Sequence, residues 1–122
     1  MSRHRNAPPP EAAVLSLRVD LPQGRIGPGK VALLEAIGRE GSISAAGRAM
    51  GMSYKRAWDL VDTLNQMLAE PVVAATPGGV GGGGAALTPA GEALIRDYRL
   101  LEAAAEEAAA GYLASLAARM KG

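Results

Sequence analysis

The stretch SISAAGRAMGMSYKRAWDLVDTLNQML, residues 42–68, constrains the fold of this chain more than any other part. Its first part, residues 45–50, is rich in alanine and predicts a short helix with Ser42 or Ser44 as its N-cap. Gly51 follows, where the left-handed conformation that ends many helices favours glycine. A second periodic segment begins a few residues later, so the stretch predicts a helix-turn-helix, a unit that DNA-binding proteins place in the major groove.

The second helix of this unit begins after Ser53, whose hydroxyl can cap it, and its side chains separate into two faces. Lys55 and Arg56 lie in the first turn, where a recognition helix meets base edges and phosphates. Trp58 is expected to supply much of the buried apolar area on the other face. That face repeats at three- and four-residue steps and comprises Tyr54, Ala57, Trp58, Val61, Leu64 and Leu68. The alternative is an ordinary amphipathic helix with a solvated polar face.

Composition limits the remaining possibilities. The 122 residues have the size of one domain, and 48% of them are hydrophobic, enough for a core. That core must be mainly aliphatic, because the chain has one Trp, three Tyr and no Phe. The formal charge of +1 confines any attraction to phosphate to local patches. The sequence has no Cys, so disulfides and thiol chemistry are excluded, and no apolar run approaches the roughly 20 residues of a membrane span.

Catalysis and metal binding find little support in the sequence. His4 is the single histidine and lies in the amino-terminal segment, and no paired carboxylates fall in a predicted pocket. The glycine-rich stretch at residues 78–84 is not followed by the Lys-Ser or Lys-Thr of a nucleotide-binding P-loop. We therefore expect no enzyme, no catalytic residue, no metal site and no cofactor in this chain. The lack of a signal-peptide apolar region leads us to expect a cytoplasmic protein.

Four segments precede the helix-turn-helix. Residues 1–12 are rich in proline and are expected to form a disordered tail; its arginines could instead touch the DNA backbone. Residues 14–20, VLSLRVD, alternate in polarity and predict a strand, and residues 21–29 predict a loop because of their Pro and Gly content. A helix from Pro28 or Gly29 to Gly41 then completes a three-helix core.

A hairpin is predicted directly after the helix-turn-helix. Residues 72–76 are a short β-prone run, residues 77–84 read PGGVGGGG, and residues 85–88 form a second run. The pattern predicts two strands joined by a long flexible loop, which in this position is the wing of a winged helix. Glycines there allow backbone amides to approach phosphate, whereas the alternative is a mobile surface loop without a role.

The last segment predicts one long helix, opened by a Thr88 cap with Pro89 in its first turn. It runs to about Ala118, with Gly111 as a weak point. Such a helix is too long to be covered by so small a domain, and its apolar seam predicts a dimer interface. The seam comprises Leu87, Leu94, Tyr98, Leu101, Ala105, Ala108, Tyr112 and Leu116. The alternative is a helix that lies along its own domain.

Two segments in combination resemble the amino-terminal DNA-binding domain of the molybdate-responsive transcription regulators of the ModE type, a winged helix related to that of LysR-type regulators. They are GSISAAGRAMGMSYKRAWDLVDTLNQ, residues 41–66, and GGVGGGGAALTPAG, residues 78–91, and the resemblance extends over roughly residues 14–112. It implies DNA contacts from the start of the recognition helix, from the preceding helix and from wing glycines. These residues are Ser53, Tyr54, Lys55 and Arg56; Ser42, Ser44 and Arg48; and Gly79, Gly81 and Gly82. The last helix corresponds to the dimerisation helix of the family.

The sequence departs from this family pattern in two places. Typical members continue into a pair of small β-barrel domains that bind molybdate or tungstate, whereas this chain ends at Gly122. We therefore expect a sensor that has been lost or that lies on a separate molybdate-binding protein. Family wings often carry basic residues, but here Ala74, Ala75, Thr76, Pro77 and Val80 stand in those places. Fewer cations predict weaker DNA binding with a shallower salt dependence.

These observations predict a mainly α fold with a small β wing: a tail over residues 1–12, a winged helix-turn-helix over 13–88 and a dimerisation helix over 89–122. The expected function is sequence-specific DNA binding by a homodimer at a palindromic operator, regulating genes of molybdenum uptake or metabolism. The alternative is a protein-interaction module that docks a separate oxyanion-sensing partner, an interpretation that the near-zero net charge favours slightly. Neither interpretation involves a membrane.

Overall fold

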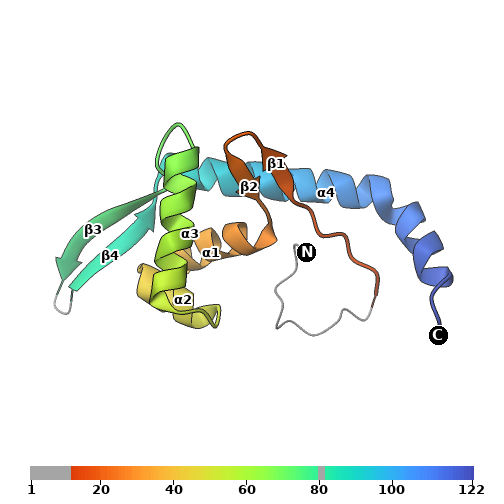
Figure 1. The fold of residues 1–122 in the computed structure, drawn as a ribbon, viewed down its shortest axis with the longest axis horizontal. Helices are drawn as coiled ribbons and strands as arrows, with labels where there is room; N and C mark the ends of the chain where they lie inside the picture. The colour runs from red at the N-terminus through yellow and green to blue at the C-terminus, as the bar shows by residue number, and fades with distance from the viewer. Residues whose placement is uncertain (1–11, 80–81) are drawn as a thin grey trace.

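A computed structural model of the chain describes residues 12–79 and 82–122. Within these residues it contains four helices and two antiparallel hairpins (Figure 1). In chain order they are β1 (Val19–Leu21), β2 (Gly24–Ile26), α1 (Pro28–Glu40), α2 (Ile43–Ala49), α3 (Tyr54–Met67), β3 (Val73–Gly79), β4 (Gly82–Leu87) and α4 (Pro89–Ala118). This is the mainly helical, winged helix-turn-helix architecture that the sequence predicts. Most of the proposed tail and Gly81 of the wing lie outside the described residues.

Hydroxyl caps and left-handed glycines set the helix boundaries. The capping side chains of α2, α3 and α4 are Ser42, Ser53 and Thr88, as predicted, and Ser42 rather than Ser44 caps α2. Their oxygens accept hydrogen bonds from the backbone N–H groups of Ala45, Arg56 and Gly91 at 3.0, 3.2 and 3.0 Å. Gly41 (φ 76°) ends α1 and Gly51 (φ 69°) forms the turn before α3, both in the left-handed region.

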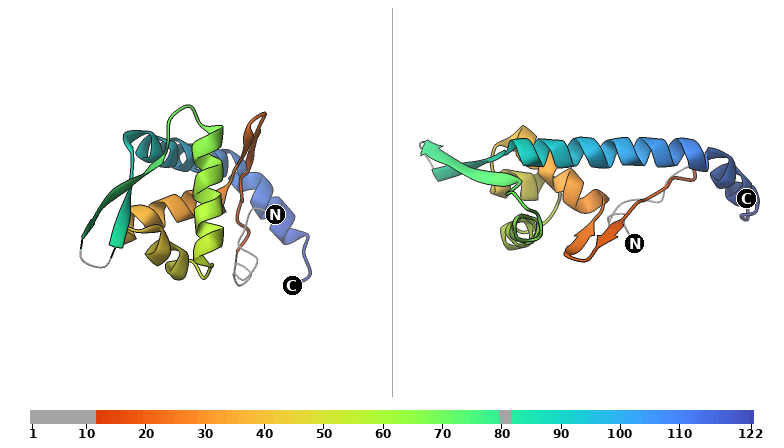
Figure 2. Two further views of the ribbon diagram at one scale, coloured as in Figure 1. Left: turned by 60° about the vertical axis from the view of Figure 1, so that its left-hand side comes forward. Right: turned by 90° about the horizontal axis from the view of Figure 1, so that it is seen from above.

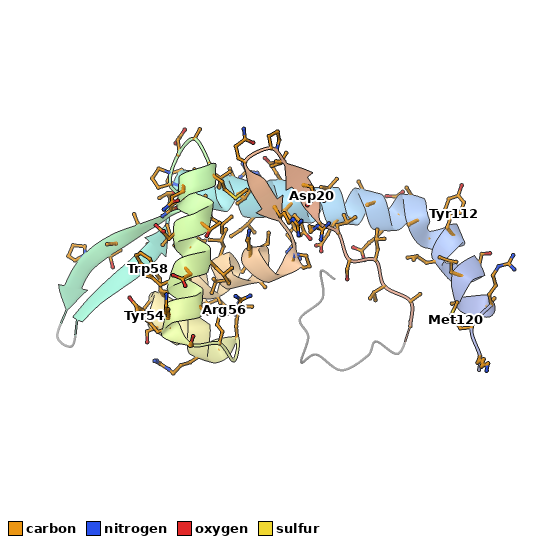
Figure 3. All side chains as sticks on the ribbon, in the orientation of Figure 1. Asp20, Tyr54, Arg56, Trp58, Tyr112 and Met120 are labelled. Carbon is orange, nitrogen blue, oxygen red and sulfur yellow. The ribbon has the colours of Figure 1, made fainter. Side chains whose placement is uncertain are left out.

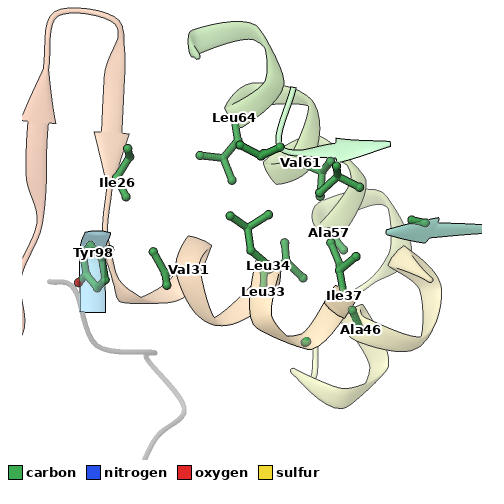
Figure 4. Packing of buried hydrophobic residues seen from close by; sticks show 14 residues of the cluster. Ile26, Val31, Leu33, Leu34, Ile37, Ala46, Ala57, Val61, Leu64 and Tyr98 are labelled. Atoms are coloured by element: carbon green, nitrogen blue, oxygen red, sulfur yellow. The ribbon is translucent and has the colours of Figure 1, made fainter. Parts of the chain in front are cut away.

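The core lies where α1 meets α2 and α3 (Figure 4). Its aliphatic side chains are fully or almost fully buried: Val31, Leu33, Leu34, Ala36 and Ile37 of α1, Ala46 of α2, and Ala57, Val61 and Leu64 of α3. Gly47 allows α2 and α3 to approach closely, because a Cβ at Gly47 would stand 3.2 Å from that of Ala57. Val72, Val73 and Ala85 of the wing base, Ile26 of β2 and Tyr98 of α4 complete the cluster.

The prediction for the amino-terminal part is wrong in detail. Residues 14–18 belong to no strand, and β1 begins only at Val19, pairing with β2 inside the segment predicted as a loop. Leu15, Leu17 and Val19 are half-buried, whereas the residues between them are exposed. The alternation of apolar and polar residues therefore reflects an extended segment that packs on one side. The same sequence pattern is found in a hydrogen-bonded strand, so it cannot distinguish the two arrangements.

The strands of the wing are longer than the sequence predicts. Strands β3 and β4 pair from Val73 opposite Leu87 to Gly79 opposite Gly82, with a register shift between Thr76 and Gly79, so they extend into the glycine run. Backbone bonds anchor the base of the wing: Ala85 N–H donates to the carbonyl of Gly41 at 2.9 Å, and Thr88 N–H to that of Val72 at 3.0 Å. Figure 2 shows the wing projecting from one end of the molecule.

Helix α4 changes its environment along its length. Its first turns pack on the core through half-buried Leu94 and Ile95 and buried Tyr98. Its later turns continue past the rest of the molecule (Figure 2), and Tyr112 and Leu116 are more than half exposed there. None of the helices in the described ranges combines the length and apolarity needed to cross a membrane.

Candidate nucleic-acid interface

Helix α3 buries a narrower face than its periodicity predicts. Ala57, Val61 and Leu64 are buried, but Tyr54 is 57% exposed and Trp58 is 46% exposed, so the expected burial of these two aromatic residues is wrong. Trp58 lies about 100° around the helix from Ala57, beyond the edge of the buried face. Figure 3 shows Tyr54 and Trp58 on the side of α3 nearest the wing and Arg56 on the opposite side.

The two cations in the first turn of α3 are exposed, as predicted. The side chain of Lys55 is 85% exposed, and its Nζ lies 3.1 Å from Oδ2 of Asp59 one turn later. An exposed i,i+4 pair of this kind stabilises a helix by only about 0.3–0.5 kcal/mol, so the ammonium can exchange its partner for a phosphate. Arg56 makes no ion pair within the part of the chain that the structure describes.

Helix α2 adds a third cation to this end of the molecule. Arg48 is exposed, and its Nη1 donates to Oγ of Ser44 at 2.9 Å, which holds the guanidinium along the helix. Ser42 and Ser53 use their oxygens for the caps described above, but the hydroxyl hydrogen of each can still be donated. The predicted contact residues of α2 and of the first turn of α3 are therefore polar groups of the helix-turn-helix. Some of them already make hydrogen bonds within their own helix or at its cap.

The wing offers backbone rather than charged side chains. Residues 73–87 contain no Lys or Arg, and Ala74, Ala75 and Ala86 are exposed. Gly79 and Gly82 are opposite each other at the described ends of β3 and β4. Any attraction of this hairpin for an anion would come from its amide groups.

Asn65 orients the wing relative to α3, and sequence reasoning missed it. Its Oδ1 accepts hydrogen bonds from the backbone N–H groups of Val72 at 2.8 Å and Val73 at 3.4 Å, and its Nδ2 donates to the carbonyl of Val73 at 3.3 Å. Thr88 makes a further hydrogen bond at the base of the wing, in which its Oγ1 donates to the carbonyl of Pro71 at 2.6 Å. In the sequence, Asn65 is a single amide side chain next to Leu64, and no pattern in the neighbouring residues identifies its hydrogen-bond partners.

The predicted seam on α4 divides into two parts. Tyr98 is 3% exposed and donates from its hydroxyl to the carbonyl of Leu17 at 2.6 Å, so it serves the core of its own chain rather than a surface for a second copy. Burial, followed by the charge of Glu102, raises the pKa of Tyr98. Leu94 and Ala105 are half-buried. Leu101, Ala108 and Tyr112 are exposed, so the accessible part of the seam is its later half.

Arg99 fixes the first half of α4 to α1. Its guanidinium donates to both carboxylate oxygens of Glu35, at 2.6 and 3.1 Å, and to Glu102 at 2.7 Å. These hydrogen bonds, first to Glu35 and then to Glu102, raise the pKa of Arg99. The described residues contain no group of three or more His, Cys, Asp or Glu side chains that could hold a metal ion.

Comparisons with known proteins add independent information. The family model "Bacterial regulatory helix-turn-helix protein, lysR family" matches residues 29–92, more than half of the chain. The molybdenum-pterin-binding protein MopB of Rhodobacter capsulatus is 63% identical over 79 residues, which are 65% of this chain and 29% of MopB. MopA of the same organism is 50% identical over 100 residues, 81% of this chain and 37% of MopA.

The DNA-binding transcriptional dual regulator ModE of Escherichia coli K12 is 45% identical over 74 residues, 61% of this chain and 28% of ModE. The chain thus spans well under half the length of these relatives. Among solved structures, that of the CbnR_DBD–DNA complex aligns with a TM-score of 0.55 and 22% identity, covering 71% of this chain and 95% of the other. At that identity the alignment demonstrates a shared fold.

Proposed function

Because the chain belongs to the lysR family of bacterial regulatory helix-turn-helix proteins, we propose that it is a transcription regulator that recognises specific DNA sequences as a homodimer. Its relatives named ModE and Mop confirm the resemblance to molybdate-responsive regulators, and the chain is a DNA-binding regulator rather than an enzyme. By the same relationship, the genes it controls are those of molybdenum uptake or metabolism, and its place of action is the cytoplasm.

The observation that carries this proposal is the exposed, capped start of α3. Lys55 and Arg56 are exposed there, and Arg48 is exposed on α2, so the helix-turn-helix carries three exposed cations, and α3 is narrow enough to enter a major groove. In the proposed complex, Lys55 and Arg56 contact base edges or phosphates, and Ser53 and Tyr54 add hydroxyl contacts. Ser42, Ser44 and Arg48 contact the backbone of the duplex, as do the amides of Gly79, Gly81 and Gly82.

The exposed half of α4 supports the homodimer. Leu101 and Tyr112 present apolar surface that is exposed in the part of the chain that the structure describes, and Ala105 and Ala108 between them are small enough to let two helices approach closely. A two-fold dimer would present two α3 helices to one face of a duplex. Its operator would be palindromic, with half-sites about 34 Å apart or a multiple of that distance.

In vitro selection from a random duplex library, followed by gel-shift titrations at several salt concentrations, tests this proposal. We expect an enriched palindrome, and Lys55→Ala and Arg56→Ala should each weaken binding and reduce the salt slope by about 1. Lys121→Ala removes an exposed cation at the far end of the chain and serves as the control. Sedimentation equilibrium of Leu101→Glu should show loss of the dimer. Failure to enrich any sequence at low salt would contradict the proposal.

One feature favours a second function, the docking of a separate oxyanion-sensing protein. The wing has no cation among residues 73–87, and the net charge of the chain is +1, so its attraction to DNA is weak for a nucleic-acid-binding domain. A chain that gives no specific gel shift at low salt, yet remains a folded dimer, would support this alternative.

A further inference from the structure

Trp58 is the only tryptophan of the chain, and its position on the surface indicates a site of contact with another molecule. It is 46% exposed and Tyr54, one turn earlier, is 57% exposed. Large aromatic side chains contribute most when they are covered, so two of them side by side in solvent at the start of an exposed helix mark a contact surface.

The direction of this aromatic pair follows from Asn65. At about 100° per residue, Tyr54, Trp58 and Asn65 lie within roughly 40° of one another around α3. Asn65 is hydrogen-bonded to the first residues of the wing, so this line of the helix faces the wing. Figure 3 shows the same arrangement, with Tyr54 and Trp58 between α3 and the hairpin.

We propose that Trp58, supported by Tyr54, contacts the sugar–phosphate strand that passes between α3 and the wing when the protein binds DNA. This inference rests on the proposed function. A duplex that receives α3 in its major groove and the wing at the neighbouring minor groove must run one strand between them, because a single backbone separates adjacent grooves. Ala74 and Ala75 of the wing are exposed and small, and since their side chains point to opposite faces of β3, the one on the face toward α3 leaves room for that strand.

The chemistry of the two surfaces is complementary. The strand offers phosphate oxygens as acceptors and sugar faces as apolar surface, whereas Trp58 offers one N–H donor on a large apolar ring. The cations of α3 lie elsewhere on the helix, Lys55 about 60° and Arg56 about 160° from Trp58. The contact is therefore uncharged, so it fixes the position of the duplex while releasing few counterions.

Fluorescence of the single tryptophan tests the inference directly in the full chain. Titration with the duplex enriched by in vitro selection should shift the emission of Trp58 to shorter wavelength and protect it from acrylamide. Trp58→Phe keeps a ring but removes the donor, and should weaken binding about ten- to a hundredfold, the range for a hydrogen bond to a charged group. Its salt slope should equal that of the wild type, whereas Arg56→Ala should reduce the slope by about 1.

Thr63→Ala, on the exposed far side of α3, is the matched control and should bind as the wild type does. Far-UV circular dichroism checks the fold of each variant. Trp58→Ala, which removes the whole ring, is a second variant, and Trp58→Phe alone is sufficient for the test if Trp58→Ala does not fold. Tight binding with unchanged emission and unchanged Trp58→Phe affinity overturns the inference and leaves the proposed function intact. A change in dimer mass, with no change in affinity, places Trp58 between subunits and also overturns it. A wild-type chain that binds no duplex overturns both.

Discussion

Gly91 and Gly111 lie on the same helix, but their surroundings differ. We expect the substitution of Gly91 by Ala to lower the free energy of unfolding and the substitution of Gly111 by Ala to raise it. Gly91 is buried in the first turn of α4, where an added Cβ would stand 2.2 Å from the carbonyl oxygen of Val72 and 3.1 Å from its carbon. Carbon and oxygen ordinarily approach to about 3.3–3.6 Å. The start of α4 must therefore move by roughly 1 Å, measured against that ordinary separation. At Gly111 an added Cβ meets nothing within 4 Å.

These contacts translate into a free energy of unfolding. Overpacking against backbone costs about 1–3 kcal/mol, and straining the Thr88 cap beside it adds about 1 kcal/mol. The better helix propensity of Ala returns at most about 1 kcal/mol. Gly91→Ala should therefore destabilise the protein by about 1–3 kcal/mol. Gly111→Ala gains only the propensity term and should stabilise it by about 0.5–1 kcal/mol.

Urea denaturation followed by far-UV circular dichroism measures this contrast. The wild type and the two variants should be compared at one protein concentration, because the proposed dimer would be more stable at higher concentration. Equal m-values would show that the unfolding transitions are comparable. If Gly91→Ala were as stable as Gly111→Ala, the start of α4 would be free to move away from Val72, and the close approach could not be a determinant of stability.

Three further predictions concern single side chains. Asn65→Ala should destabilise the protein by about 2–4 kcal/mol in urea titrations, because it leaves the buried N–H groups of Val72 and Val73 without their acceptor; Asn65→Asp keeps that acceptor and should lose less. Tyr98→Phe should cost about 1 kcal/mol. The difference in the free energy of unfolding between the wild type and Tyr98→Phe should be fully present below about pH 10. It should disappear as the pH rises through the raised pKa of Tyr98, because only the neutral hydroxyl donates to Leu17. Trp58→Ala should cost under about 1.5 kcal/mol, whereas a buried Trp would cost about 3–5 kcal/mol; a larger loss would contradict its exposed position.

The sequence predicts features that depend on neighbouring residues. The Ser53 cap and the Gly51 turn are local arrangements, and their hydrogen bonds and dihedral angles can be anticipated from a few residues. The exposure of Lys55 follows for the same reason. These local signals were sufficient to identify the helix-turn-helix and the order of its elements.

Features that depend on distant partners could not be predicted. Periodicity placed Trp58 on the buried face, but burial depends on what covers a side chain, and the neighbouring wing consists mainly of Ala and Gly. Tyr98 fits the seam of α4 equally well as an interface residue, and only the contact with Leu17, 81 residues away in the sequence, assigns it to its own core. The hydrogen bonds of Asn65 have no local pattern at all.

Gly41 brings three elements together at one residue. It ends α1, precedes the cap of α2, and accepts a hydrogen bond from β4 through its carbonyl. The hydrogen bonds of Asn65 connect α3 to the base of the wing, and those of Arg99 connect the first half of α4 to α1. In the proposed homodimer, a regulatory signal that arrives through α4 would therefore act on the separation of the two DNA-binding units along the duplex rather than on the internal shape of either one.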